Sequence, residues 1–397
     1  MSDQAKDQLH DILKIGVKKG ASDIHLKAGL PPLFRIDGSL RPLREEDRLE
    51  ADTLQTMAEA IMTDDQKRGF NEHLDYDFSY GVSGVGRFRV NVFQQRKKIG
   101  MVFRVIPFRV RSIDELHLPD VVKTLSDKRR GLILCTGITG SGKSTTLAAM
   151  LNRINESRTA HIITIEDPIE YVIRDKRSVV NQRELGQDAT SYKRALRAAL
   201  RQDPDVIMVG EMRDYETMEI ALTAAETGHL VLSTLHTVDA ADAVNRIVTA
   251  FPPELRDRAR YQFANLFEGV IAQRLLPRAD GQGRIPAAEI LVSTARTREM
   301  IHEKATPGMI TEQMAEGVET YGMQVFDQSL MHLLQEGYIT YEEAVAHSSN
   351  PEDFKLRMKG VDSASRGAEW KQFESNDSDD QPDEQNFDLD NFEMDDV

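Results

Sequence analysis

The first third of the chain carries two hydrophobic periods, one typical of helices and one typical of strands. Over residues 1–20, apolar side chains recur every three or four positions up to Gly20, which predicts an amphipathic helix. Asp37-Gly38 stands between two runs in which apolar and polar residues alternate, which predicts a β-hairpin. The full pattern predicts the order α-β-β-α-β-β-β and a small α+β domain with mostly antiparallel strands over residues 1–107. The other elements that we expect here are a strand within 22–29, a helix over 52–70 and three strands within 75–107.

From residue 131 onward the pattern changes to short, uninterrupted apolar runs with helical stretches between them. Such runs are typical of parallel strands that helices cover on both faces. The fold class that we expect is therefore α/β, with a parallel sheet in a domain over 121–360 and a linker before it at 108–120. The end of that domain, over 253–360, is expected to be largely helical. The apolar runs lie at 131–135, 161–165, 206–209 and 230–232.

Composition excludes several classes of protein. No apolar stretch among the 397 residues approaches the ~20 positions that cross a bilayer, and the charged start lacks the apolar core of a signal peptide. A membrane span and export by a cleaved signal are therefore not expected. Cys135 is the single cysteine, which excludes a disulfide framework and a cysteine-based zinc site and favours a reducing cytosol.

The net charge of −15 comes mostly from the end of the chain. Residues 361–397, the acidic tail, contain 13 Asp or Glu against two basic residues and carry −11, which leaves −4 for the remainder. A nearly balanced body argues against nucleic-acid binding, for which a basic surface supplies most of the affinity. We expect the tail to be disordered and solvated. The alternative is a docking peptide, in which Phe387, Leu389 and Phe392 bind a partner with a basic groove.

The strongest chemical signal is GITGSGKS, which matches the phosphate-binding pattern G-x-x-x-x-G-K-[ST] between a predicted strand and a predicted helix. Glycines let the backbone N–H groups turn inward around phosphate oxygens, and the helix that follows presents its positive end. Lys143 would reach the β- and γ-phosphates, and the Ser144 hydroxyl would ligate Mg²⁺. The nucleotide-binding residues predicted from this motif are Gly137, Ile138, Thr139, Gly140, Ser141, Gly142, Lys143, Ser144 and Thr145.

Three later strands offer further groups near the edge where open α/β sheets bind ligands. Glu166 ends one strand, Glu211 follows another, and His236 follows a third, which His229 precedes. Taken singly, each glutamate could equally be a solvated loop carboxylate, and each histidine is better explained by a structural role. Their convergence with the phosphate-binding loop favours a single hydrolytic site.

Phosphoryl transfer usually needs further positive charge. Arg89 and Arg104 lie on predicted strands of the first domain, so either would reach a nucleotide only across the domain boundary. A surface or ion-pair role is the alternative for both.

Several motifs together resemble one known family. GITGSGKSTTLAAM, IITIEDPIEY, DPDVIMVGEMRD and AAETGHLVLSTLHT resemble the Walker A, Asp box, Walker B and His box motifs of the type II/IV secretion ATPase superfamily. With GASDIHLKAG, GRFRVNVFQQR and YGMQVFDQSL, the chain resembles the type IV pilus retraction ATPases of the PilT and PilU kind over about residues 5–360. The resemblance implies a hexamer of subunits with an N-terminal PAS-like domain and a RecA-like ATPase domain. It also implies that ATP hydrolysis drives pilus retraction and twitching motility.

The same resemblance implies roles for individual residues. Glu211 corresponds to the Walker B glutamate, the preferred catalytic group and a contact for Mg²⁺ together with Ser144, and Glu166 corresponds to the Asp box glutamate. Arg89 and Arg104 correspond to N-terminal-domain arginines that meet the phosphates. His236 corresponds to the His box residue near the γ-phosphate, with His229 less directly involved. The cofactors implied are ATP and Mg²⁺.

One departure bears on the subtype. STARTREMIHEKATPGMI keeps only a loose likeness to the AIRNLIRE-like helix of the principal retraction ATPases, and together with the acidic tail this favours an accessory, PilU-type member. The partners then implied are a principal retraction ATPase and an inner-membrane platform protein, with the motor cytoplasmic and peripheral to the inner membrane. The rivals are a pilus assembly or type II secretion ATPase, which usually carries a paired CxxC zinc module, and a non-catalytic, nucleotide-binding ring scaffold.

Overall fold

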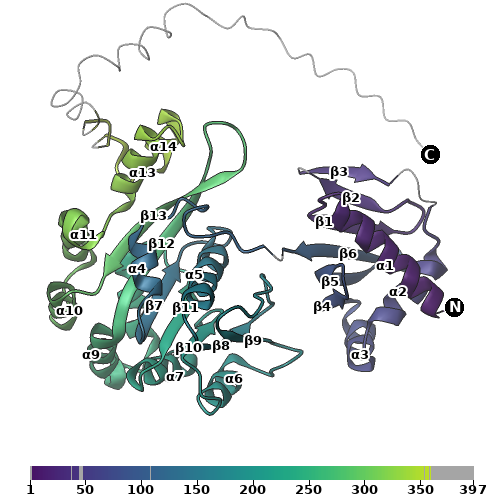
Figure 1. The fold of residues 1–397 in the computed structure, drawn as a ribbon, viewed down its shortest axis with the longest axis horizontal. Coiled ribbons are helices and arrows are strands. Elements are labelled where there is room, and N and C mark those ends of the chain that lie inside the picture. The colour runs from purple at the N-terminus through teal and green to yellow at the C-terminus, as the bar shows by residue number, and fades with distance from the viewer. Residues whose placement is uncertain are drawn as a thin grey trace, which may run out of the picture.

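The computed structural model describes residues 2–36, 38–43, 48–107, 109–352, 354–356 and 358, which form two separate sheets with their own helices (Figure 1). The acidic tail and Asp37 lie outside the described residues. None of the helices in the described part is both long and apolar enough to cross a bilayer. The predicted domain limits at residues 107, 120 and 360 stay predictions.

The first sheet, called the N-terminal sheet below, is antiparallel in the strand order β3-β2-β1-β6-β5-β4. Successive side chains on a strand point to opposite faces of the sheet. Phe88 and Phe103 are therefore fully buried on the face that α1 and α2 cover, while Arg89 and Arg104 lie on the opposite face. The polar face is therefore free to meet another part of the chain. The elements are α1 (Ser2–Lys18), β1 (Asp23–Lys27), β2 (Leu33–Ile36), β3 (Ser39–Pro42), α2 (Ala51–Ile61), α3 (Asp64–His73), β4 (Asp75–Val82), β5 (Gly86–Gln95) and β6 (Lys98–Ile106).

This part contains one strand and one helix more than the predicted order. The strand in 22–29 and the two hairpin strands are all present, as β1, β2 and β3. The predicted helix over 52–70 is two helices, α2 and α3, because Thr63 begins a new one. Its hydroxyl accepts a hydrogen bond from the Gln66 backbone N–H, and the Gln66 side chain accepts one from the Thr63 N–H, so a capping box separates the two helices.

The second sheet, called the central sheet below, has the order β13-β12-β7-β11-β10-β8-β9. Its strands are parallel except for the antiparallel pair of β12 and β13, and helices cover both faces (Figure 1). The predicted α/β class is confirmed, and α5, α6 and α7 lie between strands as expected. Its elements up to β11 are α4 (Val121–Ser126), β7 (Gly131–Thr136), α5 (Lys143–Ser157), β8 (His161–Glu166), β9 (Val179–Glu184), α6 (Tyr192–Ala199), β10 (Val206–Val209), α7 (Tyr215–Glu226) and β11 (Leu230–Leu235).

The expectation that 253–360 is largely helical was wrong for its middle part. Two long strands, β12 (Phe267–Pro277) and β13 (Arg284–Val292), form a hairpin there, and β12 extends the sheet beside β7. Both strands are buried on both faces, so they lack the regular alternation of apolar and polar residues that marks a half-exposed strand. The helices around them are α8 (Ala240–Ala250), α9 (Arg256–Leu266), α10 (Ala295–His302), α11 (Pro307–Glu316), α12 (Val318–Tyr321), α13 (Phe326–Gln335) and α14 (Tyr341–His347), with a 3₁₀ turn at Pro253–Leu255.

A buried carboxyl joins this hairpin to α8. Glu289 on β13 is 5% exposed, and its Oε1 accepts a hydrogen bond from the first backbone N–H of the helix, at Ala240 (2.7 Å). Burial raises the pKa of Glu289 and the nearby Asp239 adds to this, whereas the hydrogen bond from Ala240 and the charge of Arg274 lower it; together they place the pKa at about 7. The folded protein therefore holds this carboxyl largely protonated at acidic pH.

This pKa predicts a pH-dependent loss of stability. The folded value lies above the ordinary 4.5, so the favourable contribution is complete below pH 4.5 and is lost as the pH rises toward 7. Glu289→Gln removes the titration, so its free energy of unfolding, relative to that of the unchanged protein, should be about 2 kcal/mol larger at pH 8 than at pH 5. Urea unfolding at both pH values measures this. An equal difference at the two pH values would contradict the assignment.

Candidate nucleotide site

The phosphate-binding loop lies between the end of β7 and the start of α5, as the motif predicted. Gly137, Gly140 and Gly142 all have positive φ, and a Cβ at Gly137 would lie 2.5 Å from the Gln273 carbonyl oxygen, so this position requires glycine. The Lys143 Nζ donates hydrogen bonds to the carbonyl oxygens of Gly137 (2.8 Å) and Ile138 (3.0 Å). The ammonium group is thus held inside the loop at the amino end of α5. The charge of the ammonium group and the positive end of the helix dipole both favour an anion at this place.

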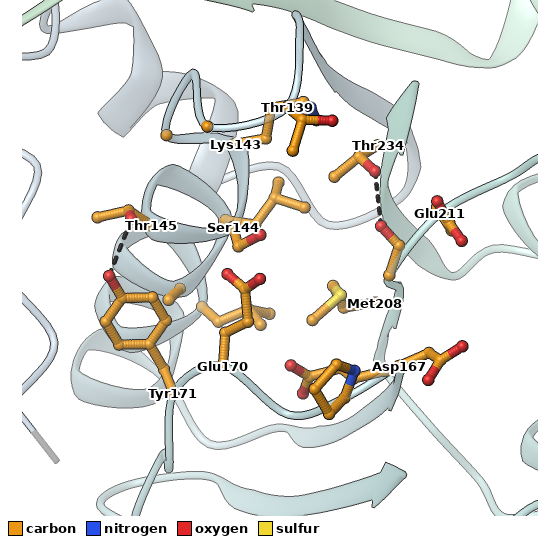
Figure 2. Close-up of a pocket in the computed structure, with 18 of the residues that line it drawn as sticks. Thr139, Lys143, Ser144, Thr145, Asp167, Glu170, Tyr171, Met208, Glu211 and Thr234 are labelled. Carbon is orange, nitrogen blue, oxygen red and sulfur yellow. Dashed lines mark hydrogen bonds between the residues drawn. The ribbon is translucent and has the colours of Figure 1, made fainter. Parts of the chain in front are cut away.

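A cleft of about 560 Å³ opens beside this loop at the carboxyl ends of β8, β10 and β11 (Figure 2). The parallel strands bring together groups that lie far apart in the sequence, because their carboxyl ends meet at one edge of the sheet. The predicted site residues that line the cleft are Thr139, Gly140, Gly142, Lys143, Ser144, Thr145, Glu166, Glu211, His236 and Arg89.

The two predicted glutamates have different environments. Glu166 is 7% exposed, and its Oε1 accepts hydrogen bonds from the Thr164 hydroxyl (2.6 Å) and the Gln182 amide (3.0 Å). Burial raises the pKa of Glu166, although these hydrogen bonds oppose the shift. Glu211 forms an ion pair with the Arg213 Nε (2.7 Å), and the His236 Nε2 lies 3.4 Å from its other oxygen. The Glu211 side chain is therefore more exposed than that of Glu166 and is paired with Arg213.

Several lining residues were not singled out from the sequence. Glu170 projects into the cleft toward Ser144, and the Tyr171 hydroxyl is 2.8 Å from that of Thr145 on α5 (Figure 2). Glu170 stands four residues after Glu166 in the same Asp box motif, and this spacing was the signal that could have found it. Tyr192 also lines the cleft. Burial, followed by the neighbouring carboxylates, raises its pKa above the ordinary value and keeps the phenol protonated.

The two predicted arginines occupy adjacent strands of the N-terminal sheet but play different parts in this conformation. Arg89 on β5 and Arg104 on β6 are register partners, and only Arg89 lines the cleft. The Arg104 Nε donates a hydrogen bond to Asp23 Oδ1 (2.9 Å). Burial alone raises the pKa of Asp23, but the hydrogen bonds from Arg104 and Ser22 outweigh it and hold the pKa below its usual range.

The two histidines lie at opposite ends of β11. His236 follows the strand and lines the cleft beside Glu211. His229 precedes the strand; its carbonyl oxygen accepts a hydrogen bond from Gly131 N, and its Nδ1 is 2.8 Å from the Ala224 carbonyl oxygen. Within this chain, the structure does not bring His229 to the cleft.

The oxygen groups of the cleft fit a magnesium ion that a nucleotide helps to hold. The exposed Ser144 hydroxyl faces a cleft that also contains the carboxylates of Glu166, Glu170 and Glu211, and Mg²⁺ prefers such ligands together with phosphate oxygens and water. Within the described ranges, no three or more His, Cys, Asp or Glu side chains are arranged to hold a metal ion alone. The donor set therefore suits a metal that arrives with phosphate.

Comparisons with known proteins place the chain in one family. The model of the type II/IV secretion system protein family matches residues 3–370. The chain is 46% identical over 344 residues to the type IV pilus retraction ATPase PilT of Pseudomonas aeruginosa, covering 87% of this chain and 99% of the relative. It is 40% identical over 352 residues to the type IV pilus ATPase PilU of the same organism, covering 89% and 91%.

A solved structure agrees with this placement. A crystal structure of the pilus retraction motor PilT with bound ADP matches with a TM-score of 0.80 and 47% identity, over 86% of this chain and 97% of that one. The chain belongs to the type II/IV secretion system protein family. Its fold is an N-terminal α+β domain followed by a RecA-like ATPase domain, which confirms the predicted class.

Proposed function

We propose that this member of the type II/IV secretion system protein family is an ATP-hydrolysing motor for type IV pilus retraction and twitching motility. The observation that carries the proposal is the cleft, which joins a phosphate-binding loop and three glutamates of the central domain with an arginine from the N-terminal sheet. The chain matches almost the whole length of two relatives, one named as a pilus retraction ATPase and one as a pilus ATPase. This supports the pilus as the structure on which the motor acts.

In the proposed reaction, the loop amides and the Lys143 ammonium bind the β- and γ-phosphates and neutralise their charge. Ser144 and Glu211 would hold Mg²⁺, which supplies positive charge to the phosphate oxygens when it is bound. The Glu211 carboxylate would orient the attacking water and accept its proton. His236 lies beside that carboxylate and would approach the γ-phosphate. Arg89 adds positive charge from the N-terminal sheet.

Work would come from domain movement. A nucleotide in the cleft contacts groups of both sheets, so ATP stabilises the arrangement in which they are together, and product release lets them part. The linker at 108–120 is the proposed hinge. We extend the proposal to a homo-hexamer, cytoplasmic and peripheral to the inner membrane, that acts on a membrane platform protein of the pilus machine.

The accessory subtype is a further part of the proposal. The altered segment at 293–310 and the acidic tail support a motor that works beside a principal retraction ATPase. The greater identity to PilT than to PilU weighs in the other direction. Retraction measured in cells that contain this motor and no related motor distinguishes the principal from the accessory subtype. A principal motor retracts pili without a second motor.

Pilus dynamics in a deletion strain test the function. Loss of a retraction motor should leave surface pili in place and stop twitching, and the unchanged gene should restore movement. Loss of surface pili would instead identify an assembly ATPase. Restoration by the Lys143→Ala protein would show that a non-catalytic scaffold role dominates.

Arg89→Ala should reduce kcat for ATP hydrolysis by about 100-fold or more, because a cation placed on the transferring phosphoryl group stabilises its developing charge. Steady-state phosphate release by purified protein measures the effect. Arg104→Ala should cost less, since Asp23 holds that guanidinium outside the cleft. Arg68→Ala on α3, which breaks an exposed ion pair with Asp65, is the matched control and should have no effect. Equal rates for Arg89→Ala and the control would remove Arg89 from the site.

A further inference from the structure

One buried carboxylate outside the catalytic set joins the two sheets. Glu184 ends β9 at the edge of the central sheet and is 3% exposed. We propose that Glu184 is a positioning residue, a latch that holds the N-terminal sheet over the cleft and so places Arg89 at the nucleotide. The inference rests on the proposed ATPase function. It adds the group that fixes the closed arrangement in which Arg89 reaches the nucleotide.

The contacts of Glu184 come from both sides. From the N-terminal sheet, the Ser79 hydroxyl donates to Glu184 Oε2 (2.8 Å), and the Arg87 Nη2 forms an ion pair with the same oxygen (3.1 Å). From its own side, the Ile169 backbone N–H donates to Oε2 (3.1 Å) and the Gln187 amide donates to Oε1 (2.9 Å). A buried carboxylate with this many donors is held in one place.

The two residues that Glu184 holds on the N-terminal side flank Arg89. Ser79 on β4 is the register partner of Arg89, and Arg87 precedes Arg89 by two positions on β5. Residues two apart on a strand share a face, so Arg87 and Arg89 both face the central sheet. Fixing Ser79 and Arg87 therefore fixes the strand positions from which Arg89 reaches the cleft.

On the side of the central sheet, Glu184 contacts the segment 166–171, which lines the cleft. It is the register partner of Glu166 on β8, and the Leu185 N–H donates to the Glu166 carbonyl oxygen (2.8 Å). Ile169, whose N–H the carboxylate accepts, lies between Glu166 and Tyr171, and the Tyr171 hydroxyl contacts Thr145 on α5. One carboxylate thus connects the segment that lines the cleft with the strand that carries Arg89.

A double-mutant cycle tests the latch. Glu184→Gln keeps the size of the side chain and an acceptor oxygen but removes the charge that holds Arg87. It should lower kcat/KM for ATP about tenfold and leave ADP affinity within about twofold, because the phosphate-binding loop is intact. Added to Arg89→Ala, it should cause no further loss, since both changes remove the same contribution. A further tenfold loss in the double variant would overturn the proposal.

Two further variants separate positioning from folding. Arg87→Gln breaks the same contact from the N-terminal side and should reproduce the tenfold loss. Glu268→Gln is the control, because Glu268 is a largely buried carboxylate paired with Lys128 (2.8 Å) away from the cleft, and its rate should be unchanged. A wild-type rate for Arg87→Gln would overturn the proposal, whereas an unchanged protein that hydrolyses no ATP would instead contradict the proposed function.

Distances between spin labels give a readout that catalysis does not influence. Lys98→Cys on β6 and Gln202→Cys after α6 are exposed positions, and the native Cys135 is buried and does not compete for the label. With a non-hydrolysable ATP analogue, and with labelled subunits diluted in unlabelled protein so that only distances within one subunit are measured, the unchanged protein should show one narrow distance distribution. The Glu184→Gln protein should show a broader distribution although it binds the analogue, and identical distributions would overturn the latch.

Discussion

Purified Lys143→Ala protein should hydrolyse ATP at the background rate, at least about 1,000-fold below the unchanged protein. The Lys143 ammonium is the positive group enclosed by the loop, and it is held at the carbonyl oxygens of Gly137 and Ile138, where the phosphates would lie. Alanine leaves the loop amides in place but removes the charge that neutralises the transferring group. Phosphate release under saturating ATP measures the rate, and fluorescent nucleotide titration measures the accompanying loss of affinity.

A surface lysine supplies the control for this change. Lys176 pairs with Glu156 near the far end of α5 and lies outside the cleft, so Lys176→Ala should retain the full rate. Hydrolysis that survived Lys143→Ala would show that another site carries the activity. A thermal unfolding midpoint equal to that of the unchanged protein shows that the loss of rate is chemical and not a failure to fold.

The part of the site that could be predicted is the part that local sequence determines. The loop from Gly137 to Ser144 needs glycines at positive φ and a lysine at the start of α5, and a single segment of the chain contains all of these. Glu166, Glu211 and His236 could be predicted for a related reason. Each follows a short apolar run, and parallel pairing brings such strand ends to one edge.

The part that could not be predicted depends on pairing between distant segments. The strand β9 is mostly polar, so no apolar run marks it, and only its place beside β8 brings Glu184 next to Glu166. The β12–β13 hairpin is buried on both faces, and periodicity does not distinguish such a strand from a buried helix. Similarly, the sequence does not tell that Asp23 holds Arg104 while Arg89 reaches the cleft, because this difference arises from cross-strand neighbours.

The intact site also bears on the rival scaffold function. A ring that only binds ATP needs the loop and the lysine but has no use for a carboxylate placed beyond the phosphates. Glu211 is held there by ion pairing with Arg213, and the Thr234 hydroxyl donates to the Gly210 carbonyl oxygen (2.7 Å), which fixes the backbone beside it (Figure 2). This arrangement favours turnover and makes Glu211 the position at which binding and hydrolysis can be separated.

Glu211→Gln should keep ATP affinity within about threefold and reduce hydrolysis by about 1,000-fold, because an amide can orient a water molecule but cannot accept its proton at neutral pH. Glu166→Gln should cost less. The Thr164 hydroxyl and the Gln182 amide already occupy the Glu166 carboxyl, so Glu166 is the weaker candidate for the base. Single-turnover hydrolysis and nucleotide titration of both variants distinguish the two glutamates.

Glu216→Gln is the matched control for this comparison, since Glu216 pairs with Lys193 on the surface between α6 and α7. Its rate should be that of the unchanged protein. If Glu211→Gln also abolished ATP binding, the carboxylate would have a structural role, in keeping with its ion pair with Arg213. If Glu166→Gln proved the more damaging change, the catalytic base would belong to β8, and Glu211 would act only on the metal and on His236.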